Sequence, residues 1–574
     1  MKLDQLVLDG CLRAVAYAVA GSGCLAPAVA VAELRFEKHG FEFDEHEIVT
    51  GSTRHQAVLT GFLLGGPVAD LAVVSIDESG GRLLRTYTYG DGTWASSLAA
   101  TLRPEVSFVD VGKIGGTDRL ITYEPGRLSW FDPESASERE LVTVHSSFSP
   151  PRKTGILHVD VTRDLNGDGR DDLVVPDVDG FRVFIQLEDG SFAAPVMLGP
   201  PTDMSRIYGA DGYRYDPWSQ SRVHELDYNH DGRSDLMFWS EDHFEIHTQD
   251  EHGLFDPDPK AVTTEVAFDS DQLSSLTTGD MTGRVLHSLT DMDGDGVADL
   301  VVFVLEGESS SSKQSRYEVH FGARAPSGDT VFDRGVDIAF QSAGRIQLGM
   351  DRHDFDGDGQ LDLMFTTIDV KLLTSSFWKR WAAFWGQSIW LNYEFYRMDG
   401  GRYRNTPSAT RRLALAIGPI KPGWVPLDLA LRGGKHESRK TQMHTIALEG
   451  GWESMEDWRR LSKISSKRYP PAFDLALLIG DVTGDGRSDL LLGVHTYVME
   501  VFVGVPGKGL FARKSRKVAV TLPHDEEYTW LVDLNNDGKQ DVVMHDPFTR
   551  RDVEGKPLQP PRADPHRVTI LMAR

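Results

Sequence analysis

The chain has 574 residues, a formal net charge of -26 and only two cysteines. Its length exceeds that of one ordinary domain, but a repeat protein grows by adding units, so one large domain is allowed. The acidity and the absence of a recognised nucleic-acid-binding motif exclude nucleic acid as the expected partner, and because no run of 18 apolar residues follows residue 32, we expect no transmembrane span.

Residues 1–32 are predicted to be a signal peptide. An apolar stretch at 14–20 follows an arginine, and small residues at 30–32 are typical of a cleavage site. Both cysteines, Cys11 and Cys24, lie in this segment, and a glycine three residues before Cys24 departs from the pattern of lipoprotein acylation. We therefore expect a secreted, periplasmic or cell-surface protein, with a cytosolic N-terminal extension as the alternative.

From about residue 60 onward the chain repeats one unit, whose clearest part is the nine-residue motif Asp-x-(Asn/Asp/Thr)-x-Asp-Gly-x-x-Asp followed by apolar residues. Six copies are present. Positions 1, 3, 5 and 9 of these copies are Asp164, Asn166, Asp168 and Asp172; Asp227, Asn229, Asp231 and Asp235; Asp291, Asp293, Asp295 and Asp299; Asp354, Asp356, Asp358 and Asp362; Asp481, Thr483, Asp485 and Asp489; and Asp533, Asn535, Asp537 and Asp541.

These loops have the chemistry of a calcium site. Four oxygen side chains converge if the glycine at position 6 allows a sharp turn, and Ca²⁺ takes six to eight oxygen ligands in flexible geometry, whereas Mg²⁺ demands a near-ideal octahedron. A plain Asp-Gly turn does not need acids at positions 1, 5 and 9 together, so six copies favour about six bound Ca²⁺. The loops hold 20 carboxylates, and six Ca²⁺ would reduce the net charge to about -14.

An EF-hand is rejected because it needs an acid at position 12 and flanking helices. Position 12 is apolar in every copy: Val175, Phe238, Val302, Phe365, Leu492 and Met544. Short apolar runs such as Leu173–Val175 follow the loops and predict buried strands.

The spacing of the loops predicts a β-propeller. The first four begin 63, 64 and 63 residues apart and the last two 52, which allows four strands and long loops in each unit. Several units also contain a turn glycine before an aromatic residue, at Trp94, Phe192, Phe255, Tyr403 and Phe511. We expect an all-β propeller of about eight four-stranded blades, with seven to nine allowed.

The loops resemble the FG-GAP (VCBS-type) repeats of integrin alpha chains and many bacterial surface proteins. The resemblance covers about residues 60 to 574 and implies calcium binding and a propeller over 33–574. It implies no particular ligand, because such propellers serve in adhesion, in lectins and as non-catalytic parts of enzymes.

Two earlier segments are weaker copies of the motif. At 110–118 the acids Asp110 and Asp118 remain but position 5 is Ile114, and at 62–70 only Asp70 remains. We expect both to lack metal. The 127 residues between Asp354 and Asp481 hold either a blade without a loop or a large insertion.

Closure of the ring requires pairing between the two ends of the chain. After Asp533 there is room for about two strands, including the run at 567–572. Segments at 34–36 and 41–43 are therefore expected to complete the last blade and remove its exposed edge.

Two segments interrupt the repeat near 370–390 and over 402–468. Residues 371–387 predict a helix whose aromatic side chains share one broad face: Phe377, Trp378, Trp381, Phe384 and Trp385. This helix either packs on the propeller or docks to a partner or membrane surface. Residues 402–468 carry 14 Lys and Arg against 6 Asp and Glu, which fits either a solvated basic face or a site for an anionic glycan or partner.

No motif for nucleophilic, zinc-dependent or phosphate-loop catalysis is present. The sequence therefore favours an exported, calcium-binding module that binds a protein or glycan surface and has no catalysis of its own. A carbohydrate-active enzyme, lyase or hydrolase, or a lectin on the same scaffold is the alternative, because glycosidase acids can lie far apart in sequence.

Overall fold

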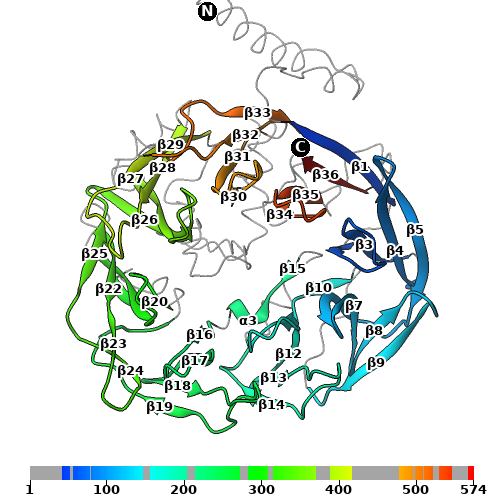
Figure 1. Cartoon of the computed structure of the whole chain (residues 1–574), viewed down its shortest axis with the longest axis horizontal. Helices are drawn as coiled ribbons and strands as arrows, with labels where there is room; N and C mark the ends of the chain where they lie inside the picture. The colour runs from blue at the N-terminus through cyan, green and yellow to red at the C-terminus, as the bar shows by residue number, and fades with distance from the viewer. Residues whose placement is uncertain are drawn as a thin grey trace, which may run out of the picture.

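The protein is an eight-bladed β-propeller. The computed structural model describes residues 42–51, 56–77, 79–146, 156–202, 214–220, 222–271, 282–307, 314–369, 388–416, 477–495, 498–507, 510–520, 529–545 and 566–574. Eight sheets, each with a core of four strands, are arranged around a common centre (Figure 1). The predicted fold class and blade number are confirmed.

The first four blades are antiparallel sheets of consecutive strands. Blade 1 contains β2 (Ala57–Gly61), β3 (Asp70–Ile76), β4 (Arg82–Gly90) and β5 (Thr93–Leu102), and blade 2 contains β6 (Phe108–Ile114), β7 (Thr117–Glu124), β8 (Arg127–Asp132) and β9 (Ser137–Thr143). Blade 3 contains β11 (Thr162–Arg163), β12 (Asp172–Asp177), β13 (Gly180–Phe184) and β14 (Val196–Leu198), and blade 4 contains β16 (His224–Leu226), β17 (Asp235–Ser240), β18 (His243–His247) and β19 (Lys260–Val262).

Blades 5 to 8 follow the same plan. Blade 5 contains β20 (Gly283–Thr290), β21 (Asp299–Glu306), β22 (Gln314–His320) and β25 (Ile338–Gln341), with the hairpin β23 (Gly322–Arg324) and β24 (Thr330–Phe332) before β25. Blade 6 contains β26 (Arg345–His353), β27 (Asp362–Asp369), β28 (Ser388–Tyr396) and β29 (Ala409–Ala416). Blade 7 contains β30 (Leu477–Gly480), β31 (Asp489–His495), β32 (Val498–Phe502) and β33 (Arg516–Ala519), and blade 8 contains β34 (Thr529–Val532), β35 (Asp541–His545), β36 (His566–Ala573) and β1 (Phe43–Gly51).

The core lies between neighbouring blades. Outside blade 2, the second strand of each blade contains an apolar run buried on both faces, as β21 shows with seven of its eight residues buried. Tyr317 of blade 5, for example, belongs to the same buried cluster as Leu363 and Phe365 of blade 6. Outer strands such as β5 and β9 are largely exposed. A blade therefore buries its apolar faces by stacking on its neighbours, as in other repeat proteins.

The ring closes through its terminal strands. β1 pairs antiparallel with β36, from Phe43 opposite Ala573 to Gly51 opposite His566, so blade 8 contains strands from both ends of the chain (Figure 1). The prediction that the N-terminal segment completes the last blade is confirmed for Phe43 onward, and residues 34–36 lie outside the described part of the chain. This pairing removes the open edges that an unclosed ring would expose.

The turn glycines lie between the third and fourth strands of their blades. In four blades the aromatic residue of the turn forms a β-bridge to a residue just after the third strand, and Phe255, Tyr403 and Phe511 are buried. These turns fix a large apolar side chain at the blade edge, where it can contact the neighbouring sheet.

Blades 6 and 7 are in direct contact despite the long gap between their loops. The guanidinium of Arg411 in β29 donates hydrogen bonds to the carbonyl oxygens of Phe511 and Ala512 in blade 7. No further blade therefore separates blades 6 and 7. The prediction of an irregular basic stretch is wrong for residues 409–416, which form β29, whereas 417–468 and the aromatic segment 371–387 lie outside the described residues.

Blade 2 differs from the weak copy of the loop that its sequence indicates. Asp110 lies inside β6, and a two-residue turn with positive φ at Gly115 and Gly116 connects β6 directly to β7. The assignment of Asp110 to position 1 of a loop is therefore wrong. Asp118 opposes Lys113 across this hairpin, as position 9 opposes the residue before position 1 in the other blades.

Two short strands extend blade 2 on its central side. β10 (Leu157–Val159) pairs in parallel with β6, and β15 (Arg214–Tyr215) pairs in parallel with β10 (Figure 1). The four-residue α3 (Pro217–Gln220) follows β15. Among the described residues, no helix has the length and apolar character needed to cross a membrane.

Candidate metal sites

The six predicted loops lie at the same place in blades 3 to 8, between the first and second strands, and are named loop 3 to loop 8 after their blades. Position 9 of each loop is the first residue of the second strand, as with Asp172 in β12 and Asp541 in β35. Each loop thus begins after the first strand and ends at the buried second strand. The pairing of these two strands fixes both ends of the loop. The structure brings the predicted residues of each loop together in one turn.

Position 1 organises the turn through hydrogen bonds. In all six loops, its Oδ2 accepts a hydrogen bond of 2.7–2.9 Å from the backbone N–H of the glycine at position 6. That glycine has a φ of 80–87° in every loop, a conformation that costs other residues about 1–2 kcal/mol. The loop shape therefore requires both residues, whether or not a cation is bound.

Position 9 is a buried connector between three segments. Its Oδ2 accepts the N–H of position 2 at 2.6–3.3 Å. Its Oδ1 accepts, at 2.7–2.8 Å, an N–H at or just after the end of the third strand. The sequence predicts position 9 only as a ligand, and the structure adds this bridging role. Asp70 of blade 1 keeps part of it by accepting the N–H of Leu64 at 2.7 Å.

Burial makes the position 9 carboxylates costly to charge. Burial raises the pKa of Asp172, Asp299 and Asp362 to about 7 and the pKa of Asp489 and Asp541 to about 6. Neighbouring loop carboxylates raise these pKa values further, whereas the hydrogen bonds from backbone N–H groups lower them. The pKa of Asp235 is raised for the same reasons. A cation in the loop would favour the charged form.

Loops 5 and 6 bring carboxylate oxygens closest together. One oxygen from each of Asp291, Asp293 and Asp295 lies within 4.8 Å of the others, and the same holds for Asp354, Asp356 and Asp362. Oxygen atoms at this separation can contact one divalent cation. These two loops are the ones that contain four carboxylates each.

Arginines partly neutralise loops 3, 4, 6 and 7. Position 7 is an arginine in loops 3, 4 and 7, where Arg170, Arg233 and Arg487 form ion pairs with the position 5 aspartates. In loop 6, Arg397 forms an ion pair with Asp356. Loop 5 instead has Val297 at position 7, so it combines four carboxylates with an apolar neighbour and is the strongest candidate for a cation.

The loops also lie at the seams between blades. A Cβ at Gly253, in the turn of blade 4, would be 2.7 Å from Nδ2 of Asn166 in loop 3. Likewise, a Cβ at Gly401 of blade 6 would be 2.9 Å from the carbonyl oxygen of Asp293 in loop 5. At these two seams the turn of one blade thus lies against the loop of the preceding blade.

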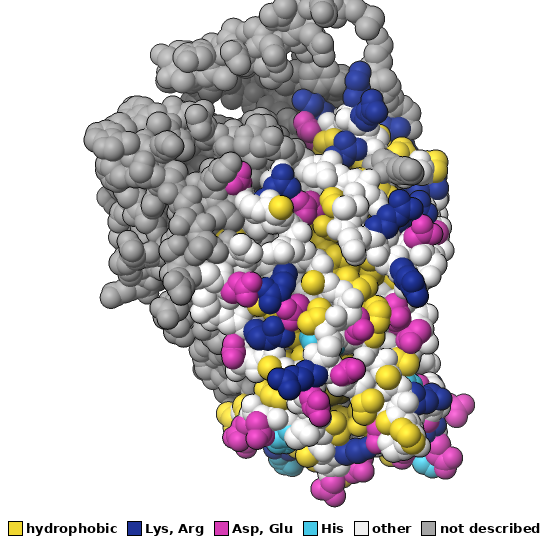
Figure 2. All heavy atoms as spheres, turned by 90° about the vertical axis from the view of Figure 1, so that its left-hand side faces the viewer, with side chains coloured by type: hydrophobic (Ala, Val, Ile, Leu, Met, Phe, Trp, Pro, Cys, Tyr) yellow, Lys and Arg dark blue, Asp and Glu magenta, His cyan; other side chains and the backbone are white. Residues whose placement is uncertain are grey.

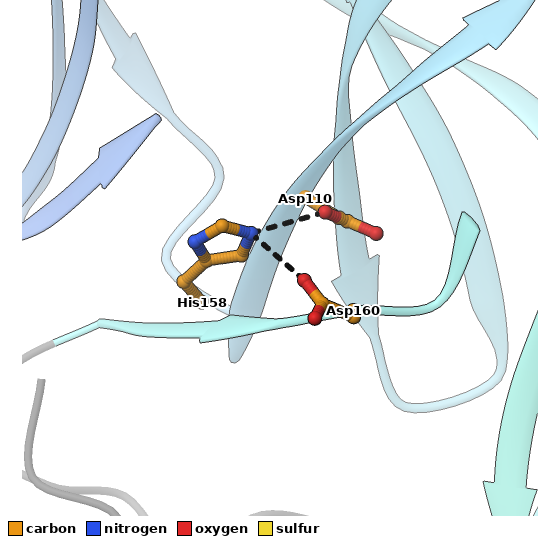
Figure 3. Close-up of side chains that lie close together, drawn as sticks. All are labelled: Asp110, His158 and Asp160. Atoms are coloured by element: carbon orange, nitrogen blue, oxygen red, sulfur yellow. Dashed lines mark hydrogen bonds and ion pairs between the residues drawn. The ribbon is translucent and has the colours of Figure 1, made fainter. Parts of the chain in front are cut away.

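A further cluster of metal-ligating side chains was not predicted from the sequence. Nε2 of His158 lies 3.1 Å from Oδ1 of Asp110 and 3.3 Å from Oδ1 of Asp160, and both carboxylates are buried (Figure 3). Burial opposes a charge on His158, but its hydrogen bonds to the two aspartates raise its pKa overall. Lys113 pairs with Asp118, and Arg163 pairs with Asp172 in the same way. Asp110 lies three residues before Lys113, and Asp160 lies three residues before Arg163. An alignment of blades 2 and 3 on these pairs could have revealed the two acids.

The described part of the side shown in Figure 2 does not concentrate one sign of charge. On the side shown in Figure 2, acidic and basic side chains are interspersed around apolar ones. Ion pairs such as Arg316 with Glu318 and Arg345 with Glu394 are found in blades 5 and 6. Long-range electrostatic attraction is therefore not the main feature of this side.

No family model and no curated protein match the chain. A solved lectin of Agrocybe aegerita, described as recognising non-reducing terminal N-acetylglucosamine, aligns at 13% identity and a TM-score of 0.40 over 84% of this chain and 100% of the lectin. The biofilm matrix protein Bap1 of V. cholerae aligns at 11% identity and a TM-score of 0.33 over 93% of this chain and 91% of Bap1. The WD40 domain of SCAP from fission yeast aligns at 11% identity and a TM-score of 0.31 over 92% of this chain and 98% of the WD40 domain. These TM-scores are below 0.5, so the propeller assignment depends on the strand order itself.

Proposed function

We propose that this chain is an exported, calcium-binding β-propeller that works as an interaction module for a protein or glycan surface. The observation that supports this proposal is the repetition of one loop geometry in six consecutive blades, with converging carboxylate oxygens in loops 5 and 6. Positions 1, 3, 5 and 9 would hold the ion. Oxygen donors from carboxylate and amide side chains are the ligands that Ca²⁺ takes.

Calcium would serve the scaffold in this proposal. It would offset the repulsion among the 20 loop carboxylates and favour the charged state of the buried position 9 groups. Because blade turns lie against loops 3 and 5, an ion in either loop would also stabilise its seam. The partner would then bind elsewhere, on a surface whose shape depends on the intact ring.

Export and partner choice rest on the sequence. Residues 1–32 support a leader, and sites of about 10⁻⁴–10⁻³ M affinity for Ca²⁺ suit an extracellular protein. The aromatic residues at 377–385 and the basic residues beyond 416 are the candidate docking segments, and both lie outside the described residues.

The binding function is tested with a panel of acidic and neutral polysaccharides immobilised on beads. The calcium-loaded protein is incubated with each, and retained protein and released sugar are measured separately. Calcium-dependent retention without released sugar supports an interaction module of the lectin type. Release of product would overturn the non-enzymatic proposal and favour the alternative, a carbohydrate-active enzyme on this scaffold.

Calcium itself is tested by counting metal in protein that has been stripped with chelator and dialysed against Ca²⁺. About six ions per chain are expected, and a chain that binds none would contradict the proposal. Replacing the exposed Asp258 by Asn provides a control for the loss of one surface carboxylate, because Asp258 lies outside the loops.

A further inference from the structure

The cluster of Asp110, His158 and Asp160 differs in chemistry from the six loops. It combines an imidazole nitrogen with two carboxylates, and one ligand atom from each residue lies within 4.8 Å of the other two. Its carboxylates are buried, with side chains 5% and 4% exposed, whereas several acids of the loops are exposed. The cluster is thus an interior site and not a surface group of acids.

The unusual strand pairing on the central side of blade 2 builds this site. β10 runs parallel to β6, which places His158 opposite Val109 and so beside Asp110. The chain then continues from β10 to Asp160 and into blade 3. Residues 48 and 50 positions after Asp110 are thereby brought to one point (Figure 3).

Hydrogen bonds fix the orientation of Asp110. Its Oδ2 accepts the backbone N–H groups of Val161 and Thr162 at 2.7 and 3.0 Å and the Thr162 hydroxyl at 2.9 Å. Oδ1 accepts the backbone N–H of Val111 at 2.8 Å and lies 3.1 Å from Nε2 of His158. Ligands of metal ions are commonly oriented by such outer hydrogen bonds.

The distances and charges fit a divalent cation. Two ligands bound to one tetrahedral zinc at about 2.0–2.1 Å lie about 3.3 Å apart, close to the observed separations of 3.1 and 3.3 Å between Nε2 and the two oxygens. A divalent cation would also balance the charges of the two buried carboxylates. Uncompensated charge is costly in a buried site.

We propose that Asp110, His158 and Asp160 form a second kind of metal site, which binds zinc or a similar divalent transition metal through Nε2 and one oxygen of each carboxylate. Imidazole suits zinc and other transition metals, whereas Ca²⁺ takes oxygen ligands, so this site and the loops select different ions. The proposal does not depend on calcium binding by the loops.

The test measures zinc binding in the presence of excess Ca²⁺. Chelator-stripped full-length protein is reloaded with Ca²⁺, titrated with Zn²⁺ and analysed for bound zinc after gel filtration. One zinc per chain is expected in the wild type, and this zinc is expected to be lost in both His158→Gln and Asp160→Asn. The loop variant Asp295→Ala is the matched control and should keep its zinc.

A wild-type chain that retains no zinc, or variants that retain the same zinc as the wild type, would overturn the proposal. If far-UV circular dichroism shows that the variants do not fold, the wild-type protein is titrated with Co²⁺ and studied by ¹⁵N-histidine NMR instead. A visible cobalt absorption with a shifted Nε2 resonance of one histidine supports the site. Absence of both contradicts it.

Discussion

The backbone N–H of Gln540 in loop 8 donates a 2.7 Å hydrogen bond to the carbonyl oxygen of Asp481, the first residue of loop 7. At the preceding seam, the hydroxyl of Ser488 in loop 7 donates at 2.8 Å to the carbonyl oxygen of Asp354 in loop 6. Position 8 of one loop thus contacts position 1 of the loop before it. Loops 6, 7 and 8 thus form a hydrogen-bonded series, so an ion in one of them would also stabilise the adjacent seam.

Removal of calcium should therefore lower the melting temperature of the whole ring. A ligand that binds only the folded state adds about 2.7 kcal/mol per site at 100 times its dissociation constant. Calorimetry with and without excess chelator, after metal removal has been verified, measures the effect. Readdition of Ca²⁺ should restore the original transition, and an unchanged melting curve in chelator would show that the loops stabilise the fold without an ion.

Single substitutions at position 5 should each remove one calcium. Asp295→Ala in loop 5 and Asp358→Ala in loop 6 delete an acid that the motif directs at the ion, while the position 6 glycine and position 1 aspartate remain. Metal content of the purified variants measures the loss. Asp258→Asn should keep the full number, and an equal loss in this control would contradict the assignment of the loops.

The repeated motif was sufficient to predict six loops, the propeller and the closing strand, because each feature is local or recurs at a fixed spacing. The register of Asp110 could not be deduced in this way. Asp110 and Asp118 are eight residues apart both in a degenerate loop and in a hairpin that turns at Gly115 and Gly116. Local sequence does not distinguish these two structures. The strand pairing shows that the segment is a hairpin.

Contacts within a sheet between separate segments of the chain also escaped prediction. His158 meets Asp110 only because β10 pairs with β6, and position 9 meets the third strand only when the sheet is formed. The motif predicts which side chains could bind an ion, but the topology determines their partners.

The turn that covers loop 3 supplies a test of coupling between a seam and its loop. Gly253→Ala introduces a Cβ 2.7 Å from Nδ2 of Asn166 and imposes a positive φ on alanine, which by itself costs about 1–2 kcal/mol. We expect lower thermal stability and weaker binding of one Ca²⁺, measured by isothermal titration calorimetry.

Gly190→Ala is the matched control for this prediction. Gly190 is the corresponding turn glycine of blade 3, with a φ of 81°, and its Cβ would be 3.6 Å from Gly115 in blade 2, which has a hairpin in place of a loop. This variant should lose similar backbone stability but keep all its calcium. Equal calcium affinity in the two variants would contradict coupling through the seam.

The aromatic segment at 371–387 remains the predicted docking surface from sequence alone. Replacing Trp378, Trp381 and Trp385 together by Ala should leave the calcium content and far-UV spectrum unchanged while abolishing retention on the polysaccharide or surface that binds the wild type. A loss of several degrees in melting temperature would instead indicate that these side chains belong to the core, and the docking hypothesis would be dropped.

The closing blade should make the protein sensitive to acid through His545. Its side chain is buried in β35, its Nε2 has no hydrogen-bond partner among the described residues, and burial together with nearby His566 lowers its pKa from 6.5 to about 3. Between these values the unfolded chain binds a proton at this position and the folded chain does not. The stability associated with neutral His545 is therefore present above pH 6.5 and is lost as the pH falls toward 3.

His545→Gln should reduce the dependence of unfolding free energy on pH between 6 and 4 by up to about 1.4 kcal/mol per pH unit, since one proton is no longer taken up on unfolding. Urea unfolding at fixed Ca²⁺ over this range measures the slope. The exposed His252→Gln is the control and should retain the wild-type slope. If the two variants have the same slope, acid unfolding does not begin with protonation of this histidine in the closing blade.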